Sequence, residues 1–349
     1  MKNLFFILSS IVLGLFFTGC SGIKYLTIET LEPAQVTLPG NVRTILVANN
    51  VVQQPNDIGH TNQLLGRSGA QRINVSSDSI SVFYTEALSQ FLNEEAFFDA
   101  VLYRQEPLRS DHDFFTEQPI SPDKMNELRT EHHVDAIISL DKLLIETHKN
   151  EHFRQQGYSW AAMKANIQSI VRVYLPSMTG QIPAVHFTDS LNWQGFERQN
   201  GYLYAEEILP SHEEAMKEAA VYAAEKMTSV FSPHWVMQDR WFYTLPNALM
   251  REGETFAQNK DWVNAVSKWE AFYEKETNEL KKAKAASNIA LAYEMLDDMQ
   301  LASEWIGKSE QLFLKATRPD SLDRKRVQIY KREIDRRRDN SNQLNMQVN

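Results

Sequence analysis

The stretch VDAIISLDKLLIET, Val134 to Thr147, decides the fold of the first half of the chain. It is dense in isoleucine and leucine, and a segment with helical spacing, Pro122 to about His132, precedes it. An apolar run of this kind after a helix predicts a strand. Downstream, residues 160–175 alternate between apolar and polar, and the turn signal Pro176–Gly180 leads back into residues 183–193. Together these segments predict a long hairpin.

Upstream of this stretch, two further strands alternate with a helix. Arg43–Asn49 and Ala100–Tyr103 are short β-rich runs, and Ser77–Ser79 offers N-caps to a helix between them. The polar segment Val51–Gln71 reads as a long loop, and the chain is almost entirely helical from about Ser211. The order β-α-β-α-β-β-β predicts an α+β fold, with an N-terminal mixed β-sheet and flanking helices followed by an all-α region.

The single cysteine of the chain lies in LFFTGC, Leu15 to Cys20, where a short apolar run ends. The run Leu4–Phe17 is too short to span a bilayer and is typical of a signal peptide. The pattern resembles the lipobox of bacterial lipoproteins, although that family prefers leucine at the position of Phe17. The resemblance implies that residues 1–19 are removed and that Cys20 carries palmitate or a similar acyl chain. An ordinary secretory signal with an incidental cysteine is the alternative.

Ser21, rather than an aspartate, follows the cysteine, which in such lipoproteins favours the outer membrane. The next residues lack the acidic run that sends some lipoproteins to the cell surface, so we expect a periplasm-facing protein, with surface display second. The formal net charge is −9. Removal of residues 1–19 takes away only Lys2, which brings the charge near −10 and argues against nucleic-acid binding.

The segment EHHVDAIISL, with Asp135 opening the strand after a helix, resembles the α/β modules of periplasmic lipoproteins involved in envelope assembly. These include the curli-secretion lipoprotein and the N-terminal domain of the Tol translocation protein. The whole chain resembles a family of uncharacterised bacterial outer-membrane lipoproteins. That resemblance implies a layout but no activity.

The helical region contains NIALAYEMLDDMQLASEWIGKSEQL, residues 288–312, which resembles a tetratricopeptide repeat (TPR). An upstream copy, REGETFAQNKDWVNAVSKWEAFYEK, covers residues 251–275. Lys260 and Asp297 replace the glycine usual at the turn, and the crossing alanines are 37 residues apart (302 − 265), against about 34 in the standard repeat. The resemblance implies these packing residues: Gly253, Phe256, Ala265, Trp269, Ile289, Ala290, Tyr293, Ala302 and Ile306.

A basic segment, DRKRVQIYKREIDRRRD, covers residues 323–339. Val327, Tyr330 and Ile334 fall on one helical stripe, which we expect to cover the second repeat-like pair. Two hypotheses remain for the arginines: a solvated helix face, or contact with anionic lipid headgroups.

No motif predicts catalysis. His148 and His152 lie four residues apart, but the apolar alternation before them favours a strand end over a metal-binding helix. Asp111-His112-Asp113 is typical of a solvated turn, and Ser211 with Glu214 of a helix capping box. Phosphate loops, nucleophile elbows and dinucleotide fingerprints are absent from the sequence. We therefore expect no enzyme, cofactor or metal, while an extracytoplasmic hydrolase stays open as the least favoured class.

An aromatic cluster, Trp235, Trp241, Phe242 and Tyr243, surrounds Arg240. Burial at a junction between domains is favoured, because aromatic side chains mostly lie in interiors. If exposed, these rings would stack on the sugars of a glycan such as peptidoglycan.

The sequence thus predicts five segments: a signal peptide at 1–19, a tether at 20–40, an α+β domain at 41–235, a TPR-like helical domain at 236–340 and a disordered tail at 341–349. The predicted function is a lipid-anchored envelope lipoprotein that acts as a non-catalytic interaction or assembly module. The expected partners are the membrane, through the lipid, and an envelope protein. A glycan- or peptidoglycan-binding module is the alternative.

Overall fold

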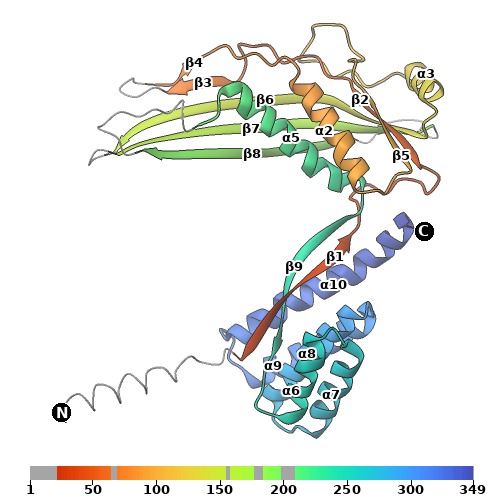
Figure 1. Cartoon of the computed structure of the whole chain (residues 1–349), viewed down its shortest axis with the longest axis vertical. Coiled ribbons are helices and arrows are strands. Elements are labelled where there is room, and N and C mark those ends of the chain that lie inside the picture. Colours follow the sequence, from red (N-terminus) through yellow and green to blue (C-terminus); the bar gives the residue numbers. More distant parts are fainter. Residues whose placement is uncertain (1–21, 64–68, 155–157, 177–183, 198–208, 349) are drawn as a thin grey trace. The chain divides into compact units, whose positions relative to one another are not determined.

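The computed structural model describes residues 22–63, 69–154, 158–176, 184–197 and 209–348. They form two compact units (Figure 1). The sheet unit comprises Pro33–His234 with Met346–Asn349, and the helical unit comprises the chain up to Glu32 together with Trp235–Asn345. The sheet unit is therefore an insertion, in sequence, within the helical unit.

Three parallel strands form the centre of the sheet unit. β2 (Thr44–Asn49) lies between β5 (Ala100–Arg104) and β6 (Ala136–Arg154). Leu46 of β2 pairs with Leu102 on one side and with Ile137 on the other. Parallel neighbours require crossover connections, which α2 (Ile80–Glu94) and α3 (Pro122–His132) supply. The apolar stretch that opens β6 is continuous because this part of β6 is buried on both faces.

β6 then continues into the predicted hairpin with β7 (Tyr158–Tyr174) and β8 (Ala184–Glu197), antiparallel throughout. Two short strands join the distal part of β6. β3 (His60–Gln63) runs parallel to it, and β4 (Gln71–Arg72) pairs antiparallel with β3. β3 lies within the segment predicted as a loop, and β4 begins at its last residue, because His60–Gln63 can complete the otherwise open edge of β6.

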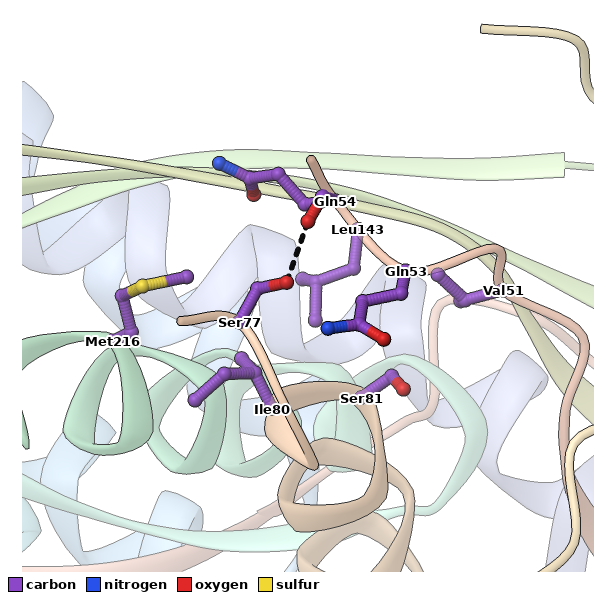
Figure 2. A pocket seen from close by; sticks show the side chains of 8 residues that line it. All are labelled: Val51, Gln53, Gln54, Ser77, Ile80, Ser81, Leu143 and Met216. Atoms are coloured by element: carbon purple, nitrogen blue, oxygen red, sulfur yellow. Dashed lines mark hydrogen bonds between the residues drawn. The ribbon is translucent and has the colours of Figure 1, made fainter. Parts of the chain in front are cut away.

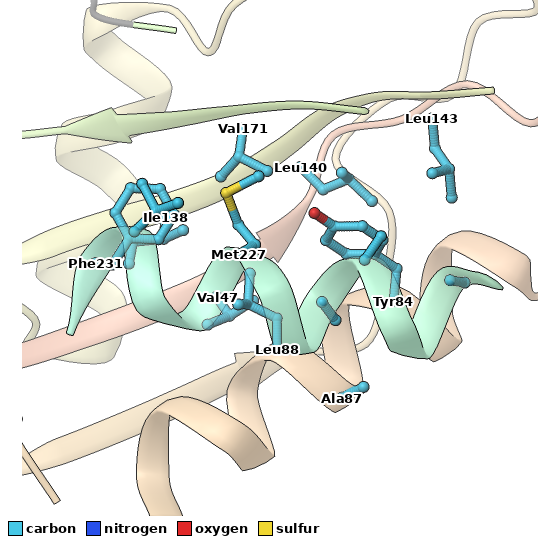
Figure 3. Packing of buried hydrophobic residues seen from close by; sticks show 14 of the residues in the cluster. Val47, Tyr84, Ala87, Leu88, Ile138, Leu140, Leu143, Val171, Met227 and Phe231 are labelled. Carbon is cyan, nitrogen blue, oxygen red and sulfur yellow. The ribbon is translucent and has the colours of Figure 1, made fainter. Parts of the chain in front are cut away.

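Helices cover both faces of this sheet. α2 and α5 (His212–Phe231) pack on one face, where Tyr84, Leu88, Met227 and Phe231 meet Ile138 of β6 (Figure 3). α3 packs on the opposite face, over Leu46, Ile137 and Tyr174. The mixed sheet with flanking helices and the helical C-terminal region confirm the predicted α+β class.

The helical unit contains two helix pairs, each joined by a short turn. The first pair is α6 (Ala248–Gln258) with α7 (Trp262–Lys275), the second is α8 (Glu279–Met295) with α9 (Met299–Ala316), and α10 (Leu322–Val348) follows them. It also contains a two-stranded ribbon of β1 (Ile23–Glu32) and β9 (His234–Tyr243). Cross-strand contacts join Gly22 to Thr244 and Thr27 to Asp239, so the strands are antiparallel (Figure 1).

The structure differs from the predicted segments at both ends of the helical unit. The predicted tether at 20–40 contains β1, and the region predicted as helical from 236 begins with β9, because these two alternating segments satisfy each other's backbone groups. The tail predicted as disordered at 341–349 is helical as far as Val348. Extending an existing helix adds one hydrogen bond per ordered residue, so the long α10 continues through weak helix formers.

Two predicted helix caps have opposite outcomes. At α5, the Ser211 hydroxyl accepts from the backbone N–H of Glu214, whose carboxylate accepts from the N–H of Ser211, which confirms the capping box. At α2, Ser79 has a left-handed backbone (φ 64°) and its side chain makes no capping hydrogen bond. The Ser76–Ser79 run instead forms a turn before the helix, in which the N–H of Ile80 donates to the carbonyl of Ser77.

Candidate functional site

The residues predicted from the repeat resemblance lie together in α6–α9. Six of them are fully buried in the hydrophobic core of the helical unit: Ala265, Trp269, Ile289, Ala290, Ala302 and Ile306. Gly253 is also buried, while Phe256 and Tyr293 are half-buried against the same core. They are therefore packing residues and present no chemistry to solvent. Cys20, the predicted lipidation site, lies outside the described residues.

The two helix pairs share a local geometry that the sequence spacing implies. Lys260 and Asp297, again 37 residues apart (297 − 260), both have φ 60°, the left-handed conformation that favours glycine. The next residue in each pair, Asp261 or Asp298, caps the following helix through its carboxylate. The turn between the two helices therefore has the same construction in both pairs.

At Gly253, α6 and α7 lie in close contact. A Cβ atom built there would lie 2.4 Å from the indole Nε1 of Trp269, whose N–H donates to the carbonyl of Met250 at 3.3 Å. The absence of a side chain therefore lets the tryptophan ring lie against the backbone of α6.

A buried cluster of charges holds the ribbon and α10 to α8. The Glu294 side chain, fully inaccessible, accepts from the guanidinium of Arg240 at 2.9–3.1 Å, from the Tyr330 hydroxyl at 2.6 Å and from Arg337. Burial alone would raise the pKa of Glu294. The hydrogen bonds and charge of Arg240, with Tyr330 and Arg337, outweigh burial and hold that pKa below its usual value.

The C-terminal arginines are bound within the helical unit more than a solvated helix face implies, while contact with lipid headgroups stays a prediction. Arg337 binds the buried Glu294, and Arg336 pairs with Glu32 of β1 at 2.9 Å. Arg338 donates to Ser303 at 2.9 Å. Glu32 and Glu294 come from other elements, which a local charge count does not show, whereas Glu333, Asp335 and Asp339 of α10 itself also pair with Arg336 or Arg338. The stripe of Val327, Tyr330 and Ile334 is buried in the core of the helical unit.

The helical unit contains a groove of about 640 Å³, which we call the β1 groove. Residues 24–29 of β1 form one side of it. Ala257, Gln258, Lys260 and Trp262, from the turn between α6 and α7, form another. Met237 and Phe242 of β9 and Met295 at the end of α8 complete the lining.

The β1 groove combines apolar surface with charges of both signs. Phe242 and Trp262 are buried, whereas Tyr25 and Met237 are 65% and 73% exposed. The ammonium of Lys24 forms an ion pair with Glu254 of α6, while Glu29 and Lys260 stand exposed at the rim. Large apolar side chains that stay open beside a hollow are typical of a binding surface.

The predicted aromatic cluster divides along β9. Phe242 and Tyr243 are buried in the core of the helical unit, and Trp241 packs against Tyr330 with ring centroids 5.5 Å apart. Arg240 is buried on Glu294. Trp235 is 65% exposed, so two of the four rings are buried and Trp241 is half-buried, all three within the core of the helical unit.

The sheet unit has a second groove, of about 540 Å³, at the carboxyl ends of β2 and β5. This is where open α/β sheets often bind ligands. Its lining includes a single arginine, Arg109, which donates to the carboxylate of Asp111 at 2.7–2.9 Å and to the carbonyls of Asp113 and Thr116. The hydrogen-bond donors of the Arg109 guanidinium are thus already used within its own loop.

A small pocket of about 10 Å³ between α2 and β6 shares Gln54 and Ser77 with this second groove. There the Ser77 hydroxyl donates to the carbonyl of Gln54 at 2.5 Å (Figure 2). The Gln54 side chain exchanges two hydrogen bonds with the backbone of Ile145, at 2.9 and 3.0 Å, as a neighbouring strand would. The pocket holds at most about one water molecule.

A directed chain of hydrogen bonds links two histidines at the distal end of β6. His212 Nε2 lies 2.6 Å from the Asn62 side-chain oxygen, so it carries the proton and Nδ1 accepts from the Thr147 hydroxyl. That hydroxyl in turn accepts from His60 Nδ1 at 2.7 Å, and His60 Nε2 faces the Gln54 amide. A second proton on either ring would oppose a donor.

Burial, and then the charge of neighbouring histidines, lower the pKa of both His60 and His212 to about 4. Both rings are neutral at pH 7 and serve as fixed structural links. Sequence reasoning assigned His212 only to the start of a helix, and did not single out His60.

The other polar motifs form no reactive group. Asp111 is exposed, and its hydrogen bonds to Arg109 lower its pKa to about 2, as expected of a solvated turn. His148 lies on β6 and contacts the Thr61 hydroxyl, while the side chain of His152 lies outside the described part. Within the described residues, no group of three or more histidine, cysteine or acidic side chains is placed to hold a metal.

Sequence reasoning missed a buried cluster in the sheet unit. Asp141, 1% exposed, accepts from Ser139, from Arg172 at 2.6 Å and from the Tyr174 hydroxyl at 2.9 Å. Arg172 also binds Glu117 at 2.7 Å. The available signal was a charge of opposite sign inside each of two apolar strands, SLDKLL and SIVRVY.

These features define a class of protein: an α+β sheet unit joined in sequence to a helical unit with a ribbon-lined groove. The chain belongs to the family described as Domain of unknown function (DUF8603), which its residues 42–243 match. Residues 251–336 match a further domain of unknown function (DUF6340). A search of curated proteins gives no match.

Among solved structures, the 1.65 Å structure of the hypothetical protein CT253 from Chlamydia trachomatis is similar, at 12% identity. The match covers 53% of this chain and 93% of that chain, with a TM-score of 0.23. A superposition this loose carries no argument about the function of this chain.

Proposed function

We propose that the protein is a bacterial outer-membrane lipoprotein, anchored through Cys20 and facing the periplasm, that binds an envelope protein without catalysing a reaction. The single observation that carries the binding role is the β1 groove. The repeat-like helix pairs α6–α7 and α8–α9 support it, because helix pairs of the TPR kind present concave surfaces for protein partners.

The proposed anchor rests on the sequence around Cys20. Each buried methylene of an acyl chain contributes about 0.8 kcal/mol, so two or three chains hold a protein firmly to a bilayer. In the described part of the chain, no helix has the length and apolar character needed to cross a membrane.

Labelling with palmitate tests the anchor. We expect the wild-type protein to incorporate label and to fractionate with outer membrane, and Cys20→Ala to lose both properties. The matched control Ser21→Ala leaves the cysteine in place and should behave as wild type. Label and membrane fractionation that survive in Cys20→Ala would contradict the anchor.

The proposed partner site is marked by large apolar side chains that are exposed to solvent. Tyr25 and Met237 border the β1 groove, and Trp235 lies two residues before Met237 on β9, so both β9 side chains emerge on the same face. Aromatic and methionine side chains are enriched at the centres of protein interfaces.

Photo-cross-linking tests this role. A benzoylphenylalanine at Tyr25 should capture a partner of one defined mass in intact envelopes. The matched control places the same group at Phe115, which is 76% exposed on the sheet unit, away from the β1 groove by sequence and unit. Capture from both positions alike, or from neither, would contradict binding at the groove.

The glycan alternative keeps one structural observation in its favour, the exposed ring of Trp235. It predicts retention of the protein on purified sacculi and loss of retention in Trp235→Ala. Protein capture at Tyr25 that persists in Trp235→Ala would favour the protein partner.

A further inference from the structure

We propose that β1 binds an extended peptide segment of the partner protein, which adds to the β1–β9 ribbon as a third strand inside the β1 groove. The inference rests on the proposed binding function and names the form that the bound segment takes. Addition of a strand to an open sheet edge is a common mode of peptide recognition.

The lining of the groove shows that β1 presents its edge to it. Six consecutive residues of β1, 24–29, line the groove, although successive side chains of a strand point to opposite faces. Only Met237 and Phe242 of β9 take part. A strand that lines a hollow with every residue borders it along its backbone, and β9 therefore lies on the other side of β1.

This edge is open in the described structure. The sheet that contains β1 has two strands, so β1 pairs with β9 alone among the described strands. An unpaired edge exposes a row of backbone donors and acceptors that a further strand can use. Six residues of antiparallel strand extend over roughly 20 Å, enough for a peptide of similar length.

The pairing with β9 shows which backbone groups point into the groove. The N–H of Thr244 donates to the carbonyl of Gly22 at 3.0 Å, so this is a hydrogen-bonded pair. Such pairs alternate along an antiparallel ladder, which directs even-numbered residues of β1 toward β9. The N–H and C=O groups of Tyr25, Thr27 and Glu29 consequently face the open edge.

The side chains around this edge specify the chemistry of the segment. Trp262, Phe242 and Met295 offer apolar surface beside the strand. The ammonium of Lys260, in the turn that borders the groove, has no ion pair or hydrogen bond to any described residue. A segment with an apolar side chain and a carboxylate near one end complements both features.

A second copy of the chain fits this edge less well. The turn from Gln258 to Trp262 borders the same groove, so a second copy would have to bring its own turn to this edge together with its β1 strand. A slender extended peptide needs less room.

Thr27→Pro tests the proposal. Proline removes the N–H that points to the groove and leaves the hydrogen bonds to β9, as proline does at open strand edges. Thr27→Val is the matched control, because both variants lose the hydroxyl that donates to Asp239 at 2.9 Å, but valine keeps the N–H. Thermal melts establish that both variants of the full chain, in detergent, are folded.

The probe is a phage library of random dodecapeptides, selected on the wild-type full chain. We expect selected peptides to bind Thr27→Val as they bind wild type, and Thr27→Pro about tenfold or more weakly by fluorescence anisotropy. Bound peptide should also slow amide exchange at Tyr25, Thr27 and Glu29. Lys260→Glu, which leaves the strand intact, should weaken peptides that carry a carboxylate.

Four outcomes would overturn strand addition: no enriched peptide, equal affinity for Thr27→Pro and Thr27→Val, slowed exchange only elsewhere, or a dimer that Thr27→Pro dissociates. The last would make a second copy the occupant. These outcomes can be distinguished from a failure of the proposed partner binding itself. Capture at Tyr25 that persists in Thr27→Pro would keep partner binding and remove only the strand.

Discussion

Each unit buries a carboxylate against an arginine and a tyrosine hydroxyl, but the two clusters hold different things together. In the sheet unit, Asp141 and Arg172 lie on neighbouring strands of one hairpin, and Arg172 keeps Glu117 as a second partner. In the helical unit, Glu294 of α8 holds Arg240 of β9 and Arg337 of α10. The first cluster reinforces a pairing that the backbone already makes, whereas the second fixes how three separate elements pack.

The comparison teaches that the cost of losing a buried carboxylate depends on which alternatives its partners keep. Arg172 retains a partly exposed carboxylate, while Arg240, 4% exposed, loses its only acidic partner in the described structure when Glu294 is neutralised. A buried charge without its partner is strongly destabilising.

Neutralising the two carboxylates gives the largest expected effect. Glu294→Gln should destabilise the helical unit by about 3–5 kcal/mol, because it leaves Arg240 uncompensated. Asp141→Asn should cost less, about 1–3 kcal/mol, since Glu117 remains for Arg172. Hydrogen exchange of α8 and of β7 reports the two units separately. Equal losses would break the comparison.

Acidification should distinguish the units next. The folded pKa of about 4 for His60 and His212 lies below the usual 6.5, so the unfolded chain binds protons first as the pH falls. This contribution is complete above pH 6.5 and is lost toward pH 4, by about 1–3 kcal/mol for each histidine.

The helical unit should respond only at lower pH, because its buried Glu294 has a lowered pKa and its stabilisation fades below the ordinary carboxylate range. Exchange rates at pH 7, 5.5 and 4.5 measure both units in one sample. His212→Gln should flatten the response of the sheet unit, and an unchanged slope in that variant would contradict the histidine assignment.

A glycine pair tests the packing of the helical unit. Gly253→Ala should cost about 1–3 kcal/mol, because the methyl group would overlap the ring of Trp269. Gly307→Ala, in α9 with open space at its Cβ, should instead stabilise by about 0.5–1 kcal/mol. Thermal melts of both variants check the opposite signs, and a shared sign would contradict the close approach of α6 and α7.

The turns between paired helices should give the smallest effect. Lys260→Gly relieves a left-handed lysine and should stabilise by up to about 1 kcal/mol, whereas Asp297→Gly should gain less, since aspartate tolerates this conformation. Lys260→Ala is the control, because it keeps the strain while removing the charge. Chemical denaturation measures all three, and a gain from alanine equal to that from glycine would point to charge as the cause.

Much of the fold could be predicted from local patterns. The hairpin follows from alternation in residues 160–175, the α+β class from the order of strands and helices, and the α5 cap from Ser211 and Glu214. Each of these signals is contained within a few neighbouring residues, where spacing alone identifies the element.

The rest depends on partners far along the chain. β1 looks like a tether until β9 is placed beside it, and Arg337 looks solvated until Glu294 is placed beside it. The β1 groove likewise combines β1 with the turn between α6 and α7. Patterns within a few neighbouring residues contain no signal for such pairings. The predicted packing residues of the helix pairs do share one core. Their assignment to a TPR-like repeat and the anchor at Cys20 stay predictions.

The insertion of the sheet unit between β1 and β9 has a consequence for how the ribbon closes. Those strands are separated by 202 positions (234 − 32), a long loop to close from an unfolded chain. Within the sheet unit, however, the N–H of Val36 donates to the carbonyl of Val230 at 2.9 Å. Once that unit has folded, its two chain ends emerge together, and the effective loop shrinks to about ten residues.

By the logarithmic dependence of closure entropy on loop length, this shortening is worth about 2–3 kcal/mol. The folded sheet unit thus lowers the entropic cost of pairing β1 with β9 to nearly that of two strands close in sequence. The inserted sheet unit should therefore fold first, and β1 and β9 should pair after it.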